Sequence, residues 1–255
     1  MLGWLLLAIP VLTLADPPAP PVADTLPSVA ISGMVQPRMA MDRPGSAEAS
    51  RTGFRFRRAR VMLDARLPGP VHAVRITPEF SGPSARLLDA WVDLVPREGL
   101  RLRAGQMQVP FNWQRDVSSA RHHLPERSGA AERLGTPGGR DVGITARVAG
   151  SGWRAEGGIF DGGGMDRRTE VTPGGLASVR AVRSLRGPIP SSESDLARTP
   201  TTVAALGMGG QVAWRSMAPA WSPDLPAPPE ARVRAGTADL VVHRSGGSLV
   251  LEGFA

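Results

Sequence analysis

Apolar and polar side chains alternate with a period of two along much of this chain. Between Arg58 and Leu67 every odd position is apolar, whereas Arg58, Arg60 and Asp64 stand at even positions. Since successive side chains of a strand point to opposite faces, one face of such a segment suits lipid or a core and the other suits water. The same scheme recurs in segments 87–95, 100–104 and 140–148, where the polar parity carries Asp89, Asp93, Arg101, Arg103 and Arg147.

Weaker copies of this pattern extend the strand prediction over most of the remaining chain. They lie at 71–80, 153–161, 176–183, 206–215, 231–243 and from 248 onward, and a first strand is expected near 29–39. The connections are rich in glycine and proline, which favour turns. Strands do not alternate with helices, so the pattern predicts an all-β fold with about eleven strands.

Two all-β architectures fit an alternating pattern. Strands of roughly 9–11 residues with charges on one parity favour a tilted, antiparallel transmembrane β-barrel that has a polar interior. A secreted, soluble β-sandwich that binds anionic polymers through its arginines is the alternative, although its strands are usually only ~5–6 residues long. The chain has no Tyr, 6 Trp and 6 Phe. This scarcity weakens the aromatic girdles expected of a barrel, and it also argues against a nucleic-acid partner that stacks its bases on aromatic rings.

The charge of the chain indicates an anionic partner. All 30 residues counted as Lys and Arg are arginines, and the formal net charge is +7. The chain has no cysteine and only four histidines, so we expect neither a disulfide nor a metal site, and no cofactor. No G-x-S-x-G motif or plausible catalytic triad is present, so we do not expect an enzyme.

The two ends of the sequence carry further predictions. Residues 1–15 are apolar, too short to span a bilayer as a helix, and are predicted to be a secretory signal peptide. A proline-rich segment follows at 16–28, and residues 29–255 are expected to form the barrel. Because the sequence stops within an alternating run, we expect it to be truncated at the C-terminus and the barrel to be partial.

One long connection interrupts the strands at about 109–138. It has a helix-like composition and carries Arg115, Arg121, Arg127 and Arg133. A long loop within a compact β-protein is usually functional, and in a wide barrel it can fold inward and narrow the interior.

Several short motifs around this loop occur in a characteristic order. They are Phe54-Arg55-Phe56-Arg57-Arg58-Ala59-Arg60, Pro78-Glu79-Phe80, Asp89-Ala90-Trp91-Val92, Gly105-Gln106-Met107-Gln108-Val109-Pro110-Phe111, Ser118-Ser119, Pro125-Glu126-Arg127-Ser128 and Gly138-Gly139-Arg140-Asp141-Val142-Gly143. Together they resemble the phosphate-selective porins (porins O and P) of Gram-negative outer membranes. The similarity runs from about Gly33 to Gly164.

The resemblance implies a sixteen-stranded barrel, usually a homotrimer, whose third extracellular loop folds inward as a constriction. It places Arg57, Arg58 and Arg60 on the wall of an arginine ladder, and Ser118, Ser119 and Arg127 on the loop. Asp89 or Asp93 would be a carboxylate that moderates the positive site. We add Arg75, Arg101, Arg103 and Arg121 to the expected anion path.

The expected function is passive diffusion of small anions, such as phosphate or polyphosphate-like solutes, across an outer membrane with its lipid and lipopolysaccharide. Arginine suits this task because its planar fork of donors meets two phosphate oxygens at once. Arg58 and Arg60 share a parity and can face one lumen. Arg57 has the other parity and needs a β-bulge or a position near the rim.

Overall fold

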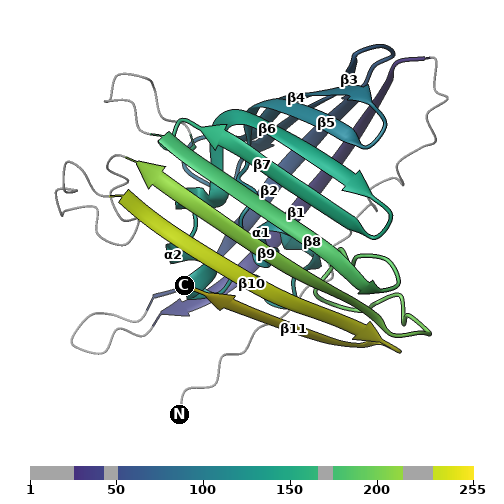
Figure 1. Ribbon diagram of the computed structural model, residues 1–255. Helices are drawn as coiled ribbons and strands as arrows, with labels where there is room; N and C mark the ends of the chain where they lie inside the picture. Colours follow the sequence, from purple (N-terminus) through teal and green to yellow (C-terminus); the bar gives the residue numbers. More distant parts are fainter. Residues whose placement is uncertain (1–25, 43–50, 166–174, 215–231) are drawn as a thin grey trace.

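The computed structural model describes residues 26–42, 51–165, 175–214 and 232–255, and these form one antiparallel sheet of eleven strands (Figure 1). The strands are β1 (Ser28–Asp42), β2 (Arg51–Arg66), β3 (Val71–Glu79), β4 (Arg86–Arg97), β5 (Leu100–Gln108), β6 (Arg140–Gly150), β7 (Trp153–Phe160), β8 (Gly175–Arg186), β9 (Val203–Trp214), β10 (Arg232–Arg244) and β11 (Gly247–Phe254).

Each strand pairs only with its neighbours in sequence, from β1 to β11. This up-and-down order confirms the predicted all-β, porin-like sheet, and the described strands do not divide into the two packed sheets of a sandwich. The sheet is not closed, since β1 and β11 each have a single neighbour. None of the described helices is long and apolar enough to cross a membrane.

The outer face of the sheet is apolar and exposed, as the parity of the strands predicts. Val92 on β4, Ile144 on β6 and Leu251 on β11 are among its exposed large side chains. Their neighbours in sequence point inward and include buried Asp93 and Thr145. A continuous exposed apolar surface of this kind is the lipid-facing band of a transmembrane sheet.

The inner face is the one covered by the long connection between β5 and β6. It is apolar where this connection rests on it: Met107, Val109, Phe160, Leu176 and Ala213 form a buried cluster with Trp91. The inner face of β8 therefore carries Leu176 and Val182 beside Ser178 and Arg180, all of them buried. The alternation of apolar and polar side chains is weak in β8 because its inner face carries apolar as well as polar groups.

The two ends of the sheet differ in their connections. At one end β2–β3, β4–β5, β6–β7 and β10–β11 are joined by tight turns, and Gly99 and Gly152 adopt the positive φ that such turns require (75° and 71°). The loop at 109–139 enters from the opposite end. The connection between β8 and β9, residues 187–202, is the exception at the first end, with sixteen residues between Arg186 and Val203.

Candidate functional site

The loop between β5 and β6 consists of four short helical turns, and the first three are started by a side-chain cap. They are α1 (Trp113–Asp116), η1 (Ser119–Arg121), α2 (Gly129–Arg133) and η2 (Pro137–Gly139). The Asn112 side chain accepts a hydrogen bond from the Arg115 amide, and the Ser128 hydroxyl accepts one from the Ala131 amide. These caps satisfy amides that the short helices leave free, so polar residues at these positions fix the course of the loop.

Strands β8, β9 and β11 hold the loop through contacts with the loop backbone. The Ser178 hydroxyl donates to the Pro110 carbonyl, and Gln211 donates to the Leu134 carbonyl at 2.8 Å. The Trp113 amide donates to the Glu252 carboxylate at 2.6 Å. A Cβ atom at Gly209 would lie 2.0 Å from the Phe111 carbonyl oxygen, so only glycine permits this approach. The loop thus lies within the curve of the sheet, where Figure 1 shows α1 and α2.

Charged contacts reinforce this attachment. The Asp116 carboxylate of α1 pairs with Arg154 on β7 and with Arg180 on β8. Arg180 also donates to Asp239 on β10 at 2.7 Å and is almost fully buried. Such a buried network is stable only when its charges balance, which gives Asp116 a fixed position.

At the N-terminal part of the sheet, β2 carries a bulge at Arg57. Gln36 on β1 lies opposite Arg58 and Pro37 lies opposite Phe56, which leaves Arg57 without a partner in the ladder. The extra residue lets both arginines reach the loop despite their opposite parity. Arg57 pairs with the Glu126 carboxylate, whereas Arg58 donates to the Pro125 carbonyl at 2.8 Å. Arg58 is 2% exposed and lies beneath the loop.

Arg60 and Ser119, two further predicted site residues, meet at the middle of β2. Arg60 pairs with Glu79 on β3 at 2.6 Å and also donates to the Ser119 hydroxyl at 3.1 Å. The neighbouring Ser118 is exposed and accepts a hydrogen bond from the Ala120 amide, so it acts as a cap for η1. Of the predicted serine pair, Ser119 is the one that contacts the arginine wall.

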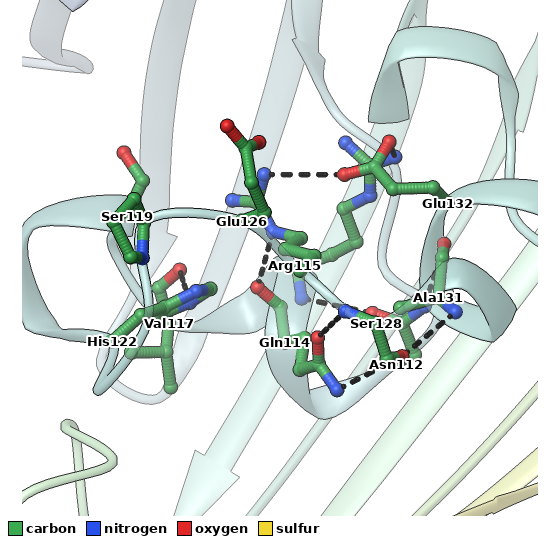
Figure 2. A network of polar contacts seen from close by, with 12 residues as sticks. Asn112, Gln114, Arg115, Val117, Ser119, His122, Glu126, Ser128, Ala131 and Glu132 are labelled. Atoms are coloured by element: carbon green, nitrogen blue, oxygen red, sulfur yellow. Dashed lines mark hydrogen bonds and ion pairs between the residues drawn. The ribbon is translucent and has the colours of Figure 1, made fainter. Parts of the chain in front are cut away.

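Within the loop, two arginines share one carboxylate (Figure 2). Arg115 donates to Glu132 at 2.5 Å, and Arg127 lies 3.7 Å from the same carboxylate while its Nε donates to the Gln114 carbonyl. Burial lowers the pKa of Arg127 well below its usual value, and the nearby charges of Arg115, Arg140 and Arg58 lower it further. Arginine remains charged at neutral pH even so, and the direction of the pKa shift reflects burial first and the neighbouring arginines second.

We call this group the arginine cluster. It contains Arg57, Arg58, Arg60, Arg115, Arg127 and Arg140, together with the carboxylates of Glu79, Asp89, Glu126 and Glu132. Asp89, predicted as a moderating carboxylate, pairs with Arg140 on β6 at 2.8 Å. Positive groups outnumber negative ones by two, so the cluster suits an anion that bears one or two negative charges.

A second group of arginines lines the inner face toward the end with the tight turns. Arg75 pairs with Asp64, Arg103 with Asp93 and Arg147 with Glu156, each with one contact of 2.6 Å, and we call these the wall pairs. Arg103 also stacks 3.5 Å from the centre of the Trp91 ring. The Asp93 carboxylate reaches Arg101 as well, at 3.5 Å, so this predicted carboxylate neutralises two wall arginines.

The structure therefore brings Arg57, Arg58, Arg60, Ser119 and Arg127 together, whereas Arg75, Arg101 and Arg103 lie apart from them. Arg121, at the tip of the loop, contacts Ser191 of the β8–β9 connection. The prediction missed Arg115, Arg140 and Arg180. Arg140 begins a strand inside the Gly-Gly-Arg-Asp motif, which was a usable signal, but no alternation marked the other two.

Comparison with known proteins identifies the family. Residues 35–184, more than half of the chain, match the phosphate-selective porins O and P. The chain belongs to this family. No curated protein matches it. The matched range runs from β1 to β8 and includes the whole loop at 109–139, so the arginine cluster lies inside the family region. Membership in a porin family implies that the chain is a channel protein.

Proposed function

We propose that this porin conducts small anions of the phosphate type by passive diffusion through an arginine-lined pore. The arginine cluster would be the central binding site, and the loop at 109–139 would be the constriction. The proposal rests above all on one observation: where the loop meets the strands, six arginines face only four carboxylates on an otherwise well-paired inner face.

The geometry of the cluster supports a phosphate-like solute. Arg57, Arg60 and Arg140 approach from the strands, while Arg127 and Ser119 approach from the loop, so donors would surround an anion from both sides. Guanidinium groups bind two oxygens of a tetrahedral oxyanion at once, which chloride cannot exploit. A monovalent halide would therefore pass with little retention, and phosphate would bind.

The wall pairs would provide weaker steps on the tight-turn side of this site. Conduction requires binding that is strong enough for entry and weak enough for release. An arginine that already shares its charge with Asp64, Asp93 or Glu156 attracts an anion only weakly, which is useful along an exit path. Arg101, the most exposed of these wall arginines and only distantly paired with Asp93, would lead toward that exit.

We also propose an outer-membrane location, with the outer face in contact with lipid and lipopolysaccharide. The exposed apolar side chains of β4, β6 and β11 support this placement. Closure of the barrel would require that the free edges of β1 and β11 be paired, because unpaired backbone groups are costly in lipid. Export by a signal peptide and assembly as a homotrimer are further parts of the proposal.

The decisive experiment is electrical. Protein purified from outer membranes would be reconstituted in planar bilayers under a KCl gradient, and the reversal potential should show preference for chloride over potassium. Phosphate added to the bath should reduce the chloride current at millimolar or lower concentration. A cation-selective channel would refute the proposed function, and an anion channel without phosphate block would refute the phosphate site alone.

A further inference from the structure

The β8–β9 connection, residues 187–202, is long at the end of the sheet where the other described connections are tight turns. In Figure 1 it forms the green loop at the end of β8. It is also polar, with Ser191, Ser192, Glu193, Ser194 and Asp195 in succession. Because tight turns connect the neighbouring strands, we expect a segment of this length and composition at this end to have a function.

Its polar stretch contacts the tip of the loop that enters from the opposite end. The Glu193 amide donates to the Arg121 carbonyl at 3.0 Å, and the Glu193 carboxylate accepts from the His123 amide at 2.7 Å. The His123 ring lies 3.6 Å from the same carboxylate. Glu193 thus binds the tip of the inward loop, residues 121–123, through both its backbone and its side chain.

The connection is itself fixed to the sheet. The Asp195 carboxylate accepts hydrogen bonds from the Thr199 amide and hydroxyl and from the Gly246 amide in the β10–β11 turn. The Thr199 carbonyl accepts from the Ser245 amide at 2.8 Å. Glu193 is therefore presented by an anchored segment rather than by a free loop.

The Glu193 contact adjoins the arginine cluster through η1. Ser119, the first residue of η1, accepts a hydrogen bond from Arg60 of the cluster at 3.1 Å, and Arg121, its last residue, accepts one from the Glu193 amide at 3.0 Å. The Glu193 side chain is 14% exposed. A carboxylate therefore lies directly beyond the excess positive charge, on the side of the tight turns.

We propose that residues 187–202 form a second part of the constriction and that Glu193 is the residue that positions the tip of the inward loop. This inference rests on the proposed function and deepens it. The pore would be narrowed by two segments from opposite ends of the barrel, joined at Arg121, His123 and Glu193. Glu193 would hold Ser119 and Arg127 in register with the wall and would set the negative limit of the anion site.

Two substitutions separate positioning from charge. Glu193→Gln keeps an oxygen that accepts from the His123 amide, whereas Glu193→Ala removes it. Loss of one hydrogen bond to a charged acceptor should let the tip leave its position about tenfold more often. Single-channel records of Glu193→Ala should therefore show brief excursions to a higher conductance about tenfold more often than the wild type, and Glu193→Gln should show few of them.

The matched control is Glu98→Ala, which removes an exposed carboxylate from the β4–β5 turn at the same end. It should leave the record unchanged. The positioning role is refuted if Glu193→Ala conducts as steadily as the wild type. It is also refuted if Glu193→Gln is as unsteady as Glu193→Ala, since charge alone would then be responsible.

A chemical test asks whether the segment lies in the ion path. The chain has no cysteine, so Glu193→Cys carries a single thiol. A charged methanethiosulfonate reagent added on the tight-turn side should reduce the current of Glu193→Cys and spare that of Ser151→Cys in the β6–β7 turn. An unreduced current would place residue 193 outside the path. Because this readout does not depend on which ion is carried, it remains informative even if the wild-type channel proves cation-selective and the proposed function fails.

Discussion

The wall pairs and the arginine cluster place the same side chain on the same face of the sheet, yet their charges are balanced differently. On the wall, Arg75, Arg103 and Arg147 each meet a carboxylate on an adjacent strand at 2.6 Å. Beneath the loop, Arg58 is held by a carbonyl and a glutamine, and Arg127 lies 3.7 Å from a carboxylate that Arg115 already occupies. The number of arginines therefore says little about where an anion would stop, and their pairing says much more.

The physical reason is that paired opposite charges cancel within a few ångströms, while an uncompensated charge acts over the width of a pore. Screening at physiological salt reaches about 8 Å in water and is weaker where groups are buried. The cluster should consequently dominate the potential of the pore. We expect four changes to affect the cluster and the wall pairs differently, the first most strongly.

Charge reversal in the cluster should have the largest effect. In Arg127→Glu the site loses one positive charge and gains a negative one, each worth about 2 kcal/mol to an anion at roughly 7 Å with an effective dielectric constant near 20. Phosphate block should weaken by at least ~10-fold, and the preference for chloride should fall. Arg97→Glu, at the exposed β4–β5 turn, is the control and should change neither. If both variants behave alike, the cluster is not the anion site.

Displacement of the loop should have the second-largest effect, because it disturbs the cluster and leaves the wall pairs in place. In Gly209→Ala the new methyl group would meet the Phe111 carbonyl oxygen, and overpacking of this kind costs roughly 1–3 kcal/mol. We expect phosphate block to weaken severalfold and the melting temperature in detergent to fall. Gly236→Ala on β10 adds the same group where nothing lies within 4 Å, so it should be neutral. Equal effects of the two substitutions would mean that Phe111 does not anchor the loop.

Removal of a wall carboxylate should make the wall resemble the cluster. Asp93→Asn releases Arg103 and Arg101 from their shared partner while Arg103 keeps its contact with Trp91. Anion preference at low salt should rise about two- to fivefold, in line with the gain of one net charge near the surface of a pore. Glu98→Gln provides the comparison. Reversal potentials that do not move would place the wall pairs outside the ion path.

The smallest effect should come from pH. Burial and the charge of Arg127 lower the pKa of His122, so its ring is neutral at pH 7 and takes up a proton only below the usual value of about 6.5. The hydrogen bond from Arg57 lowers the pKa of Glu126, which keeps that carboxylate ionised as the pH falls. Acidification should thus add positive charge beside the cluster and raise chloride preference slightly, and His122→Gln should lose that increment. A pH response that is identical in the variant would assign the effect to other groups.

Much of the fold could be predicted from the alternation alone. The apolar parity of β2, β4 and β6 predicted both the strands and their faces. The opposite parity of Arg57 and Arg58 predicted either a bulge or a position near the rim, and the structure contains the bulge. The pairing of the charges could not be predicted, because it depends on the register between strands and on the loop. Arg140 meets Asp89 across a distance of 51 residues, and Arg180 meets Asp116 across 64. The inward loop also weakens the alternation of β8, because the inner face of this strand carries Leu176 and Val182 as well as Ser178 and Arg180.

The bulge at Arg57 exchanges the two faces of β2. Beyond it the strand resumes with its faces exchanged, so Phe54 and Phe56 lie exposed, at 84% and 57%, although their numbers share the parity of buried Arg58. One extra residue thereby lets a single strand present aromatic rings on the outer face at one end and arginines on the inner face at the other. Deletion of residue 57 would restore a uniform alternation and turn those rings toward the inner face.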